Sequence, residues 1–205
     1  MISVVTAWLN SPELVPAYER AVKGAQVIII DNGSDAATTD ALRGMVDRLD
    51  GIFIRNENNT GFAAANNQGM AAATGDIVVF LNNDIEAFGD WLGIVAQLKS
   101  GGLYSPSMLM QYVNGIPVMY LEGWCLIGYR ADFERIGGWA ADWQGLYWED
   151  NELCWRASRA GLRLEQIPLP LAHLSNYTTS KTPGAYDQSA ANRARFEAIV
   201  REAQQ

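Results

Sequence analysis

The sequence has few of the residues that build disulfide frameworks and metal cages. Of its 205 residues, two are cysteine (Cys125 and Cys154) and one is histidine (His173). The two cysteines fit no zinc or redox spacing, so we expect reduced thiols in a cytoplasmic protein. Long apolar runs are missing too. No stretch approaches the ~18 residues of a membrane span, which predicts no integral membrane segment.

Positive charge is also scarce. Lys and Arg number 15 against 23 Asp and Glu, and the deficit is uneven: residues 1–150 carry a net −10 and residues 151–205 a net +2. An acidic body argues against a broad nucleic-acid surface, although a local basic patch near the C-terminus stays possible. Repeats and low-complexity linkers are absent. The 49% apolar content predicts one well-packed domain over residues 1–205.

Short apolar runs alternate with helical patterns up to residue 102. The clearest run, Ile77 to Leu81, is bounded by turn residues and is typical of a fully buried strand. The alternation predicts a parallel sheet with right-handed crossovers. The expected strands are 2–7, 27–30, 52–55 and 77–81, and the expected helices are 11–22, 39–49, 63–73 and 91–99.

After residue 102 the pattern changes. Two strand-like stretches follow each other without a helix between them, which predicts hairpins or mixed pairing. The expected elements are strands within 103–110 and 118–127, a helix 129–136, an aromatic loop 139–148, a helix 149–160, a strand 162–167, a loop 168–183 and a helix 185–204.

Polar side chains follow two of the expected strands. Asp31 and Asn32 come after the second strand, and Asn82, Asn83 and Asp84 come after the fourth. Ligands of open α/β sheets bind at the carboxyl ends of strands. Oxygen ligands there suit Mg²⁺ or Mn²⁺ held jointly with substrate phosphates. The same residues are also ordinary loop formers, so both interpretations stay open.

The stretch 56–75 is rich in Asn, Ala and Gly. Ala63 to Ala73 favours a helix, and its small side chains would let a ligand or another backbone approach closely. The helix start near Gly61 could present N–H groups to an anion. Tight packing of a small-residue helix on the sheet explains the alanines equally well, but explains Asn66 less readily.

The ordered set of motifs carries more information than any one of them. The set is Asp31, then Asn59-Thr60-Gly61-Phe62 with Asn66, then Asn82-Asn83-Asp84, then Gly137-Gly138-Trp139, then Trp148-Glu149-Asp150-Asn151-Glu152 with Ala160-Gly161. In this order the sequence resembles the family 2 glycosyltransferases of the GT-A fold, including rhamnosyltransferase-like members, over residues 2–175.

The resemblance implies an α/β fold with a Rossmann-like, mostly parallel sheet flanked by helices and a mixed C-terminal portion. Residues 1–102 would bind the nucleotide sugar, and residues 103–205 would face the acceptor and carry a lid loop and terminal helix. The implied activity is metal-dependent, inverting transfer of a sugar from a nucleotide-diphosphate donor to a hydroxyl. The acceptor stays open among a glycan, a lipid-linked glycan, a protein and modified nucleic acid.

The resemblance also implies roles for single residues. Asp84 matches the metal-binding acid, with Mn²⁺ or Mg²⁺ as the cofactor. Asn82 replaces the first acid of that motif, so the diphosphate would supply much of the coordination. His173 is a candidate late ligand, although a lone loop histidine is more often a bystander. The implied donor-binding residues are Thr6, Ala7, Trp8, Asp31, Asn32, Gly61, Asn66, Asn82 and Asn83.

Asp150 matches the family's catalytic base, and Glu149 is the second candidate. A positioned carboxylate can take the proton of an attacking hydroxyl, but acids in a first helical turn are also favoured by the helix dipole. Further candidates with equally open structural explanations are Trp143 and Trp148 for sugar stacking and Lys181, Arg193 and Arg195 for phosphate contacts.

Two other functions fit the same architecture. A GT-A-like nucleotidyltransferase usually carries a Gly-rich, basic signature near its N-terminus, and residues 4–11 have none. A catalytically inactive nucleotide-sugar-binding protein would not need both Asp84 and Asp150.

Overall fold

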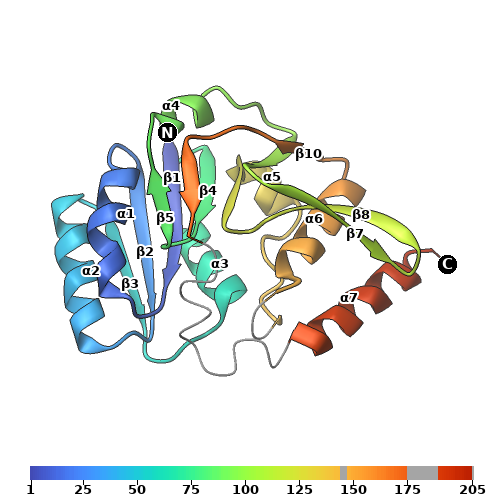
Figure 1. Ribbon diagram of the computed structural model, residues 1–205, viewed down its shortest axis with the longest axis horizontal. Helices are drawn as coiled ribbons and strands as arrows, with labels where there is room; N and C mark the ends of the chain where they lie inside the picture. Colours follow the sequence, from blue (N-terminus) through green and yellow to red (C-terminus); the bar gives the residue numbers. More distant parts are fainter. Residues whose placement is uncertain (144–146, 175–188, 205) are drawn as a thin grey trace.

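The structure, a computed structural model, describes residues 1–143, 147–174 and 189–204 (Figure 1). Its centre is a seven-stranded sheet in the order β10-β6-β9-β4-β1-β2-β3. Strands β4, β1, β2 and β3 pair in parallel, and β10 pairs in parallel with β6. Strand β9 runs antiparallel to both of its neighbours. The predicted α/β fold with a mostly parallel sheet is therefore confirmed.

The elements alternate as predicted through the first half of the chain. The strands are β1 (Ile2–Trp8), β2 (Gln26–Asn32), β3 (Ile52–Asn56), β4 (Ile77–Leu81), β5 (Ile85–Ala87), β6 (Gly102–Ser105), β7 (Met108–Val113), β8 (Ile116–Leu121), β9 (Cys125–Tyr129), β10 (Arg163–Gln166) and β11 (Leu171–His173). The helices are η1 (Pro12–Leu14), α1 (Val15–Val22), α2 (Ala36–Arg48), α3 (Phe62–Ala72), α4 (Trp91–Val95), α5 (Arg130–Arg135), α6 (Glu149–Arg159) and α7 (Ser189–Glu202).

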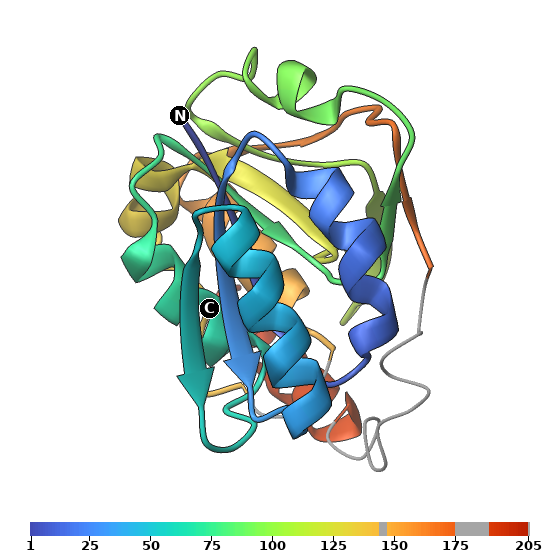
Figure 2. The same cartoon turned by 90° about the vertical axis from the view of Figure 1, so that its left-hand side faces the viewer.

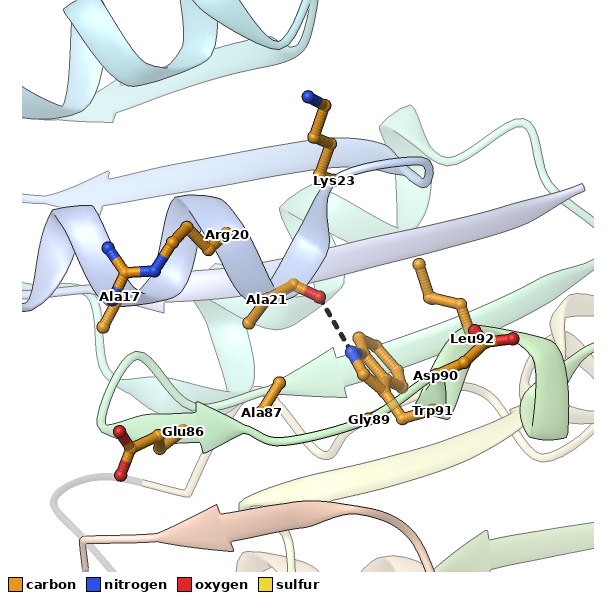
Figure 3. A pocket seen from close by; sticks show the side chains of 10 residues that line it. All are labelled: Ala17, Arg20, Ala21, Lys23, Glu86, Ala87, Gly89, Asp90, Trp91 and Leu92. Atoms are coloured by element: carbon orange, nitrogen blue, oxygen red, sulfur yellow. Dashed lines mark hydrogen bonds between the residues drawn. The ribbon is translucent and has the colours of Figure 1, made fainter.

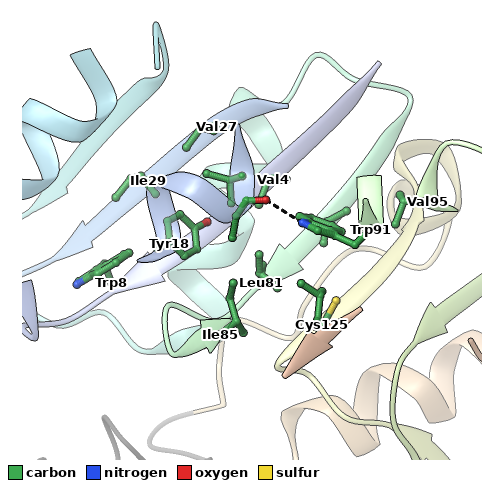
Figure 4. Packing of buried hydrophobic residues seen from close by; sticks show 14 of the residues in the cluster. Val4, Trp8, Tyr18, Val27, Ile29, Leu81, Ile85, Trp91, Val95 and Cys125 are labelled. Atoms are coloured by element: carbon green, nitrogen blue, oxygen red, sulfur yellow. Dashed lines mark hydrogen bonds between the residues drawn. The ribbon is translucent and has the colours of Figure 1, made fainter. Parts of the chain in front are cut away.

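Helices cover both faces of the sheet. Figure 2 shows α1 and α2 side by side in front of the strands, and α3, α5 and α6 lie behind the sheet from that side. Alternate residues of the buried strands serve the two cores. Val79 and Leu81 of β4 belong to the cluster of α1 and α2, in which Figure 4 shows Leu81. Val78 and Phe80 belong to the cluster of α3, α5 and α6. Every residue of β4 is buried, as its apolar run predicts.

Three local expectations were wrong. Ser11 does not cap a helix with its side chain, because it lies in the left-handed region (φ 62°) and a 3₁₀ turn precedes α1. Helix α4 ends at Val95 and not near residue 99. The expected loop 168–183 contains strand β11, which pairs antiparallel with β5. This small sheet escaped detection because each of its strands has only three residues, too few to show a period.

A β7–β8 hairpin forms a separate two-stranded sheet, and α7 packs against it (Figure 1). The hairpin and α7 share a third apolar cluster built on Val113, Val118, Phe196 and Val200. Within the three described ranges, no helix has the length and apolar character needed to cross a bilayer.

Candidate active site

The carboxyl ends of β1 and β2 lie side by side, with Trp8 paired to Asp31. Thr6 is buried, and its hydroxyl contacts the Tyr18 hydroxyl and donates to the Leu81 carbonyl at 2.8 Å. Trp8 is buried too, and its ring N–H donates to a backbone carbonyl 2.6 Å away. The polar groups of both side chains therefore make intramolecular contacts. Any ligand contact from residues 6–8, including half-buried Ala7, would therefore come mainly from the backbone.

Asp31 is fully buried and already accepts several hydrogen bonds. The Ser34 N–H donates to one oxygen at 2.9 Å, the Thr39 hydroxyl donates to the other at 2.7 Å, and Arg55 forms an ion pair with it. Burial acts to raise the pKa of Asp31, but these hydrogen bonds and the Arg55 charge outweigh it and hold the pKa below its usual value. Of the ion pair, only Arg55 reaches the surface. A nucleoside at this edge would meet its guanidinium first.

Asn32 organises an uncharged network between β2, β3 and the start of α3. Its amide donates to Asn59 at 2.7 Å and to the Gly61 carbonyl at 3.4 Å, and its oxygen accepts from Asn56 at 3.0 Å. Gly61 begins α3 with φ 86°, a conformation that favours glycine. Its N–H already binds the Asn59 side chain. Asn66 is buried on α3, and its Nδ2 has no hydrogen-bond partner within the described chain.

The structure brings Asp84 and His173 together. The Nε2 atom of His173 lies 3.1 Å from Asp84 Oδ1 and 3.3 Å from Asn82 Nδ2. The two residues are 89 positions apart in sequence, and the β5–β11 pairing joins them. Asn83, between Asn82 and Asp84 in sequence, is buried. No group of three or more His, Cys, Asp or Glu side chains gathers in the described chain. One carboxylate and one imidazole are thus the protein donors available here.

One carboxylate and one imidazole fit a divalent cation that also binds a substrate diphosphate, and they fit poorly to a site built entirely from protein. An imidazole nitrogen suits Mn²⁺ better than Mg²⁺, which prefers oxygen ligands. Of the two ions predicted from the sequence, an imidazole ligand would therefore favour Mn²⁺ over Mg²⁺.

Two consecutive residues between β8 and β9, Gly123 and Trp124, contact both Asp150 and His173. The Trp124 ring stacks on His173 with ring centroids 4.9 Å apart, and its carbonyl accepts from the Asn82 N–H at 2.7 Å. The preceding Gly123 N–H donates to Asp150 at 3.2 Å. Asp150 and His173, which lies beside Asp84, thus both contact one short segment at the edge where β4 ends and β9 begins.

Glu149 and Asp150 open α6 and are half-buried. Asp150 accepts hydrogen bonds from the backbone N–H groups of Gly123 (3.2 Å) and Asn151 (2.8 Å). Burial raises the pKa of Asp150 to about 6 against the effect of these donors, and the nearby Glu122 charge adds to the rise. Burial and then repulsion from Asp150 raise the pKa of Glu149 to about 8. Burial thus favours the protonated form of each carboxyl group.

The other sequence candidates have structural partners. Arg193 pairs with Glu197, and Arg195 pairs with Asp142. Trp143 is buried and lies beneath the Arg195 guanidinium, 4.6 Å from the ring centroid. Each of these three side chains therefore already has a partner within the protein. Lys181 lies outside the described residues.

A surface cavity of about 390 Å³ lies away from these acids, between α1, β5 and α4 (Figure 3). Arg20 and Lys23 line one wall, and Glu86 and Asp90 line the other. The Asp90 carboxylate already accepts from a backbone N–H at the start of α4. The mixed charges give the cavity no preference for the anionic diphosphate of a nucleotide sugar.

Sequence reasoning missed Gly123, Trp124 and Arg55. Gly123 and Trp124 belong to no recognisable motif, and the pairing of β9 with β4 brings them to this site. Arg55 ends the expected third strand, and Asp31 follows the expected second strand. The opposite charges at the ends of neighbouring strands could have indicated that the two residues pair.

Solved structures define the class of this fold. The mannosyltransferase PcManGT from Pyrobaculum calidifontis, in complex with GDP-Man and Mn²⁺, aligns with a TM-score of 0.66 and 19% identity over 82% of this chain and 54% of that chain. GalNAc-T7 with UDP, GalNAc and Mn²⁺ aligns with a TM-score of 0.70 and 14% identity over 84% of this chain and 43% of that chain. The chain has the GT-A glycosyltransferase fold.

Sequence comparison gives the family. Residues 3–102 match the family model described as glycosyl transferase family 2. A curated relative, the pre-mycofactocin glycosyltransferase of Mycobacterium tuberculosis, is 26% identical over 198 residues. That alignment covers 83% of this chain, which spans 42% of the relative's length. The N-terminal part of the chain, residues 3–102, is thus similar to the family 2 glycosyltransferases.

The close approach of Gly123 to Asp150 gives a first prediction. A Cβ atom at Gly123 would lie 3.3 Å from the Asp150 Cβ and 3.4 Å from Trp139, so Gly123→Ala should displace the carboxylate by a few tenths of an ångström. We expect kcat to fall by about 10-fold, because small misplacements of reacting groups slow catalysis strongly. Steady-state kinetics on a hydrolysed or transferred donor would measure the loss.

Gly44→Ala in α2 is the matched control, since its Cβ would meet only the flexible end of Arg48. Equal kcat values in both variants and the wild type would show that the Gly123–Asp150 contact has no role in positioning the acid.

Proposed function

We propose that this protein is a metal-dependent, inverting glycosyltransferase that uses a nucleotide-diphosphate sugar. The observation that supports the proposal most directly is that one short segment, Gly123–Trp124, contacts both Asp150 and His173, which lies beside Asp84. Inverting transfer needs a charge-compensating group beneath the leaving diphosphate and a base on the opposite side of the sugar. The described residues supply candidates for both.

Each residue has a distinct part in this proposal. Asp84 and His173 would hold Mn²⁺, and the Trp124 ring stacked on the imidazole would orient His173. When bound, the cation neutralises charge that develops on the departing diphosphate. Asp150 would accept the proton of the acceptor hydroxyl as the oxygen attacks the anomeric carbon. Glu149, whose pKa is also raised by burial, is the second candidate for that step.

The donor would lie along the carboxyl ends of β1, β2 and β4. Backbone groups of residues 6–8, together with Arg55 held by Asp31, would face the nucleoside. The buried Asn66 amide and the Asn32 network would shape the edge at the start of α3. We propose that the whole chain acts as one domain, with residues 1–102 binding the donor and residues 103–205 facing the acceptor, and that it works in the cytoplasm. The structural neighbours were solved with GDP-Man or UDP, so both nucleotides merit testing.

Hydrolysis of nucleotide sugars in the absence of an acceptor tests the function. We expect slow, Mn²⁺-dependent release of free sugar from one member of a panel of UDP-, GDP- and dTDP-sugars. The first-formed anomer, seen by NMR, should be inverted relative to the donor. Thermal stabilisation by a nucleotide sugar without any hydrolysis or transfer would instead indicate a catalytically inactive binding protein. Cleavage between the two phosphates would indicate nucleotidyl chemistry.

The raised pKa of Asp150 gives a pH prediction. A base must be unprotonated, so the rate should rise as the pH increases through about 6. The Glu122 charge favours the protonated form of Asp150, so Glu122→Gln should lower the pKa and move the acid limb to lower pH. A profile of kcat against pH measures both effects.

Glu134→Gln, on the exposed side of α5, removes a distant charge and serves as the control. If Glu122→Gln and Glu134→Gln had identical acid limbs, Asp150 would not be the group that titrates in the profile.

A further inference from the structure

Helix α6, which carries the proposed base, starts from an unfavourable backbone turn. Tyr147 (φ 73°) and Trp148 (φ 78°) are consecutive residues in the left-handed region, and neither is glycine. This conformation is unfavourable for residues with a side chain, and more so for bulky ones. The Trp148 side chain makes no capping hydrogen bond at this helix start. Surrounding contacts must therefore hold the turn.

Helix α7 contacts both left-handed residues of this turn. Its buried stripe is Asn192, Phe196 and Val200, at spacings of four residues. Asn192 is an amide in a position where the period favours an apolar side chain. Its Nδ2 donates to the carbonyl oxygen of Tyr147 at 3.1 Å. That carbonyl belongs to the first of the two left-handed residues.

Neighbouring residues of α7 hold the same region. The Phe196 ring packs on Trp148 with centroids 5.9 Å apart, and the Arg193 guanidinium lies 5.9 Å from the Trp148 ring centroid. Arg195 donates to the Asp142 carbonyl at 3.2 Å and pairs with its carboxylate. Helix α7, placed below α6 and the hairpin in Figure 1, thus contacts the described chain on both sides of residues 144–146.

The turn is coupled to Asp150 through the first turn of α6. The Trp148 carbonyl accepts from the Glu152 N–H at 3.0 Å, which fixes the helix start. From that start, Asp150 reaches the Gly123 N–H at 3.2 Å. Rotation of the turn toward ordinary backbone angles would change the direction in which α6 begins and move the carboxylate away from Gly123.

We propose that Asn192 is a positioning residue for Asp150: by holding the Tyr147 carbonyl, it stabilises the left-handed turn from which the catalytic helix starts. The part of this inference that concerns catalysis rests on the proposed function. Asn192 itself contacts no reacting group. Helix α7 is, on this view, part of the catalytic apparatus, although it lies in the segment of the chain beyond the family match.

Asn192→Leu tests the proposal because it retains the packing and removes the donor. We expect faster hydrogen exchange in a peptide spanning 147–156, unchanged exchange in peptides from β1 and β4, a kcat about 10-fold lower and an unchanged donor KM. Adding Tyr147→Gly should restore most of the loss, since glycine adopts positive φ without support. A loss caused by poorer packing of α7 would not be reversed by a change of backbone preference at residue 147.

Arg201→Leu, on the exposed end of the same helix, is the control and should change neither exchange nor kcat. Unchanged exchange over 147–156 in Asn192→Leu would overturn the inference whatever the activity, and so would a loss of kcat that Tyr147→Gly fails to restore. If the wild type cleaves no nucleotide sugar but Asn192→Leu still loosens 147–156, the proposed function fails and the structural role of Asn192 stands.

Discussion

Asp150→Asn is expected to lower kcat by about 10²–10⁴-fold while the donor still binds, because the amide cannot accept the proton of the attacking hydroxyl. Its one amide oxygen can still accept the hydrogen bond from Gly123, although the hydrogen bond from Asn151 to the second carboxylate oxygen is then lost. Transfer or hydrolysis kinetics measure kcat, and a thermal shift with the nucleotide sugar measures binding.

The same substitution should raise stability at alkaline pH. The folded-state pKa of about 6 lies above that of an ordinary aspartate, so the folded protein binds the proton more tightly than the unfolded chain. This contribution to stability is complete at pH values below about 4 and is lost as the pH rises through 6. Asparagine carries no charge to desolvate. The melting temperature of Asp150→Asn should therefore exceed that of the wild type at pH 8, with the advantage shrinking toward pH 4.

Asp40→Asn, on the exposed side of α2, is the matched control for both measurements. Full transfer activity in Asp150→Asn would remove Asp150 from the role of base. Glu149→Gln would then be the next variant to measure.

Asp84→Ala is expected to reduce the Mn²⁺-activated kcat/KM on the order of 100-fold or more, because it removes the one carboxylate that the described protein offers to the cation. His173→Ala should have a smaller effect, seen chiefly as a higher Mn²⁺ concentration for half-activation, since the diphosphate and Asp84 remain as ligands. Titration of activity with Mn²⁺ after treatment with a chelator measures both changes.

Glu86→Ala provides the control, because this exposed acid of β5 lies two residues from Asp84 and lines the separate cavity between α1 and α4. An Asp84→Ala enzyme with unchanged Mn²⁺ dependence would contradict the metal site. If His173→Ala and the wild type had the same Mn²⁺ concentration for half-activation, His173 would not be a metal ligand.

The sequence predicted the N-terminal half of the fold closely. Strands β1 to β4 and helices α2 and α3 lie within a few residues of their expected positions, because each is long enough to show its own apolar period. Expectations were wrong where local patterns are short. The Ser11 start became a 3₁₀ turn, and the two three-residue strands β5 and β11 were missed. These last two strands are the ones that bring His173 to Asp84.

The sequence by itself determined the α/β class and the resemblance to family 2 glycosyltransferases, because periodicity and ordered motifs are local properties of a chain. Tertiary structure alone decided which of those residues meet. Asp84 lies beside His173, Asp150 lies against Gly123, and Asn192 holds the Tyr147 carbonyl. These contacts span 27 to 89 residues and follow from strand pairing and helix packing, which no local pattern encodes.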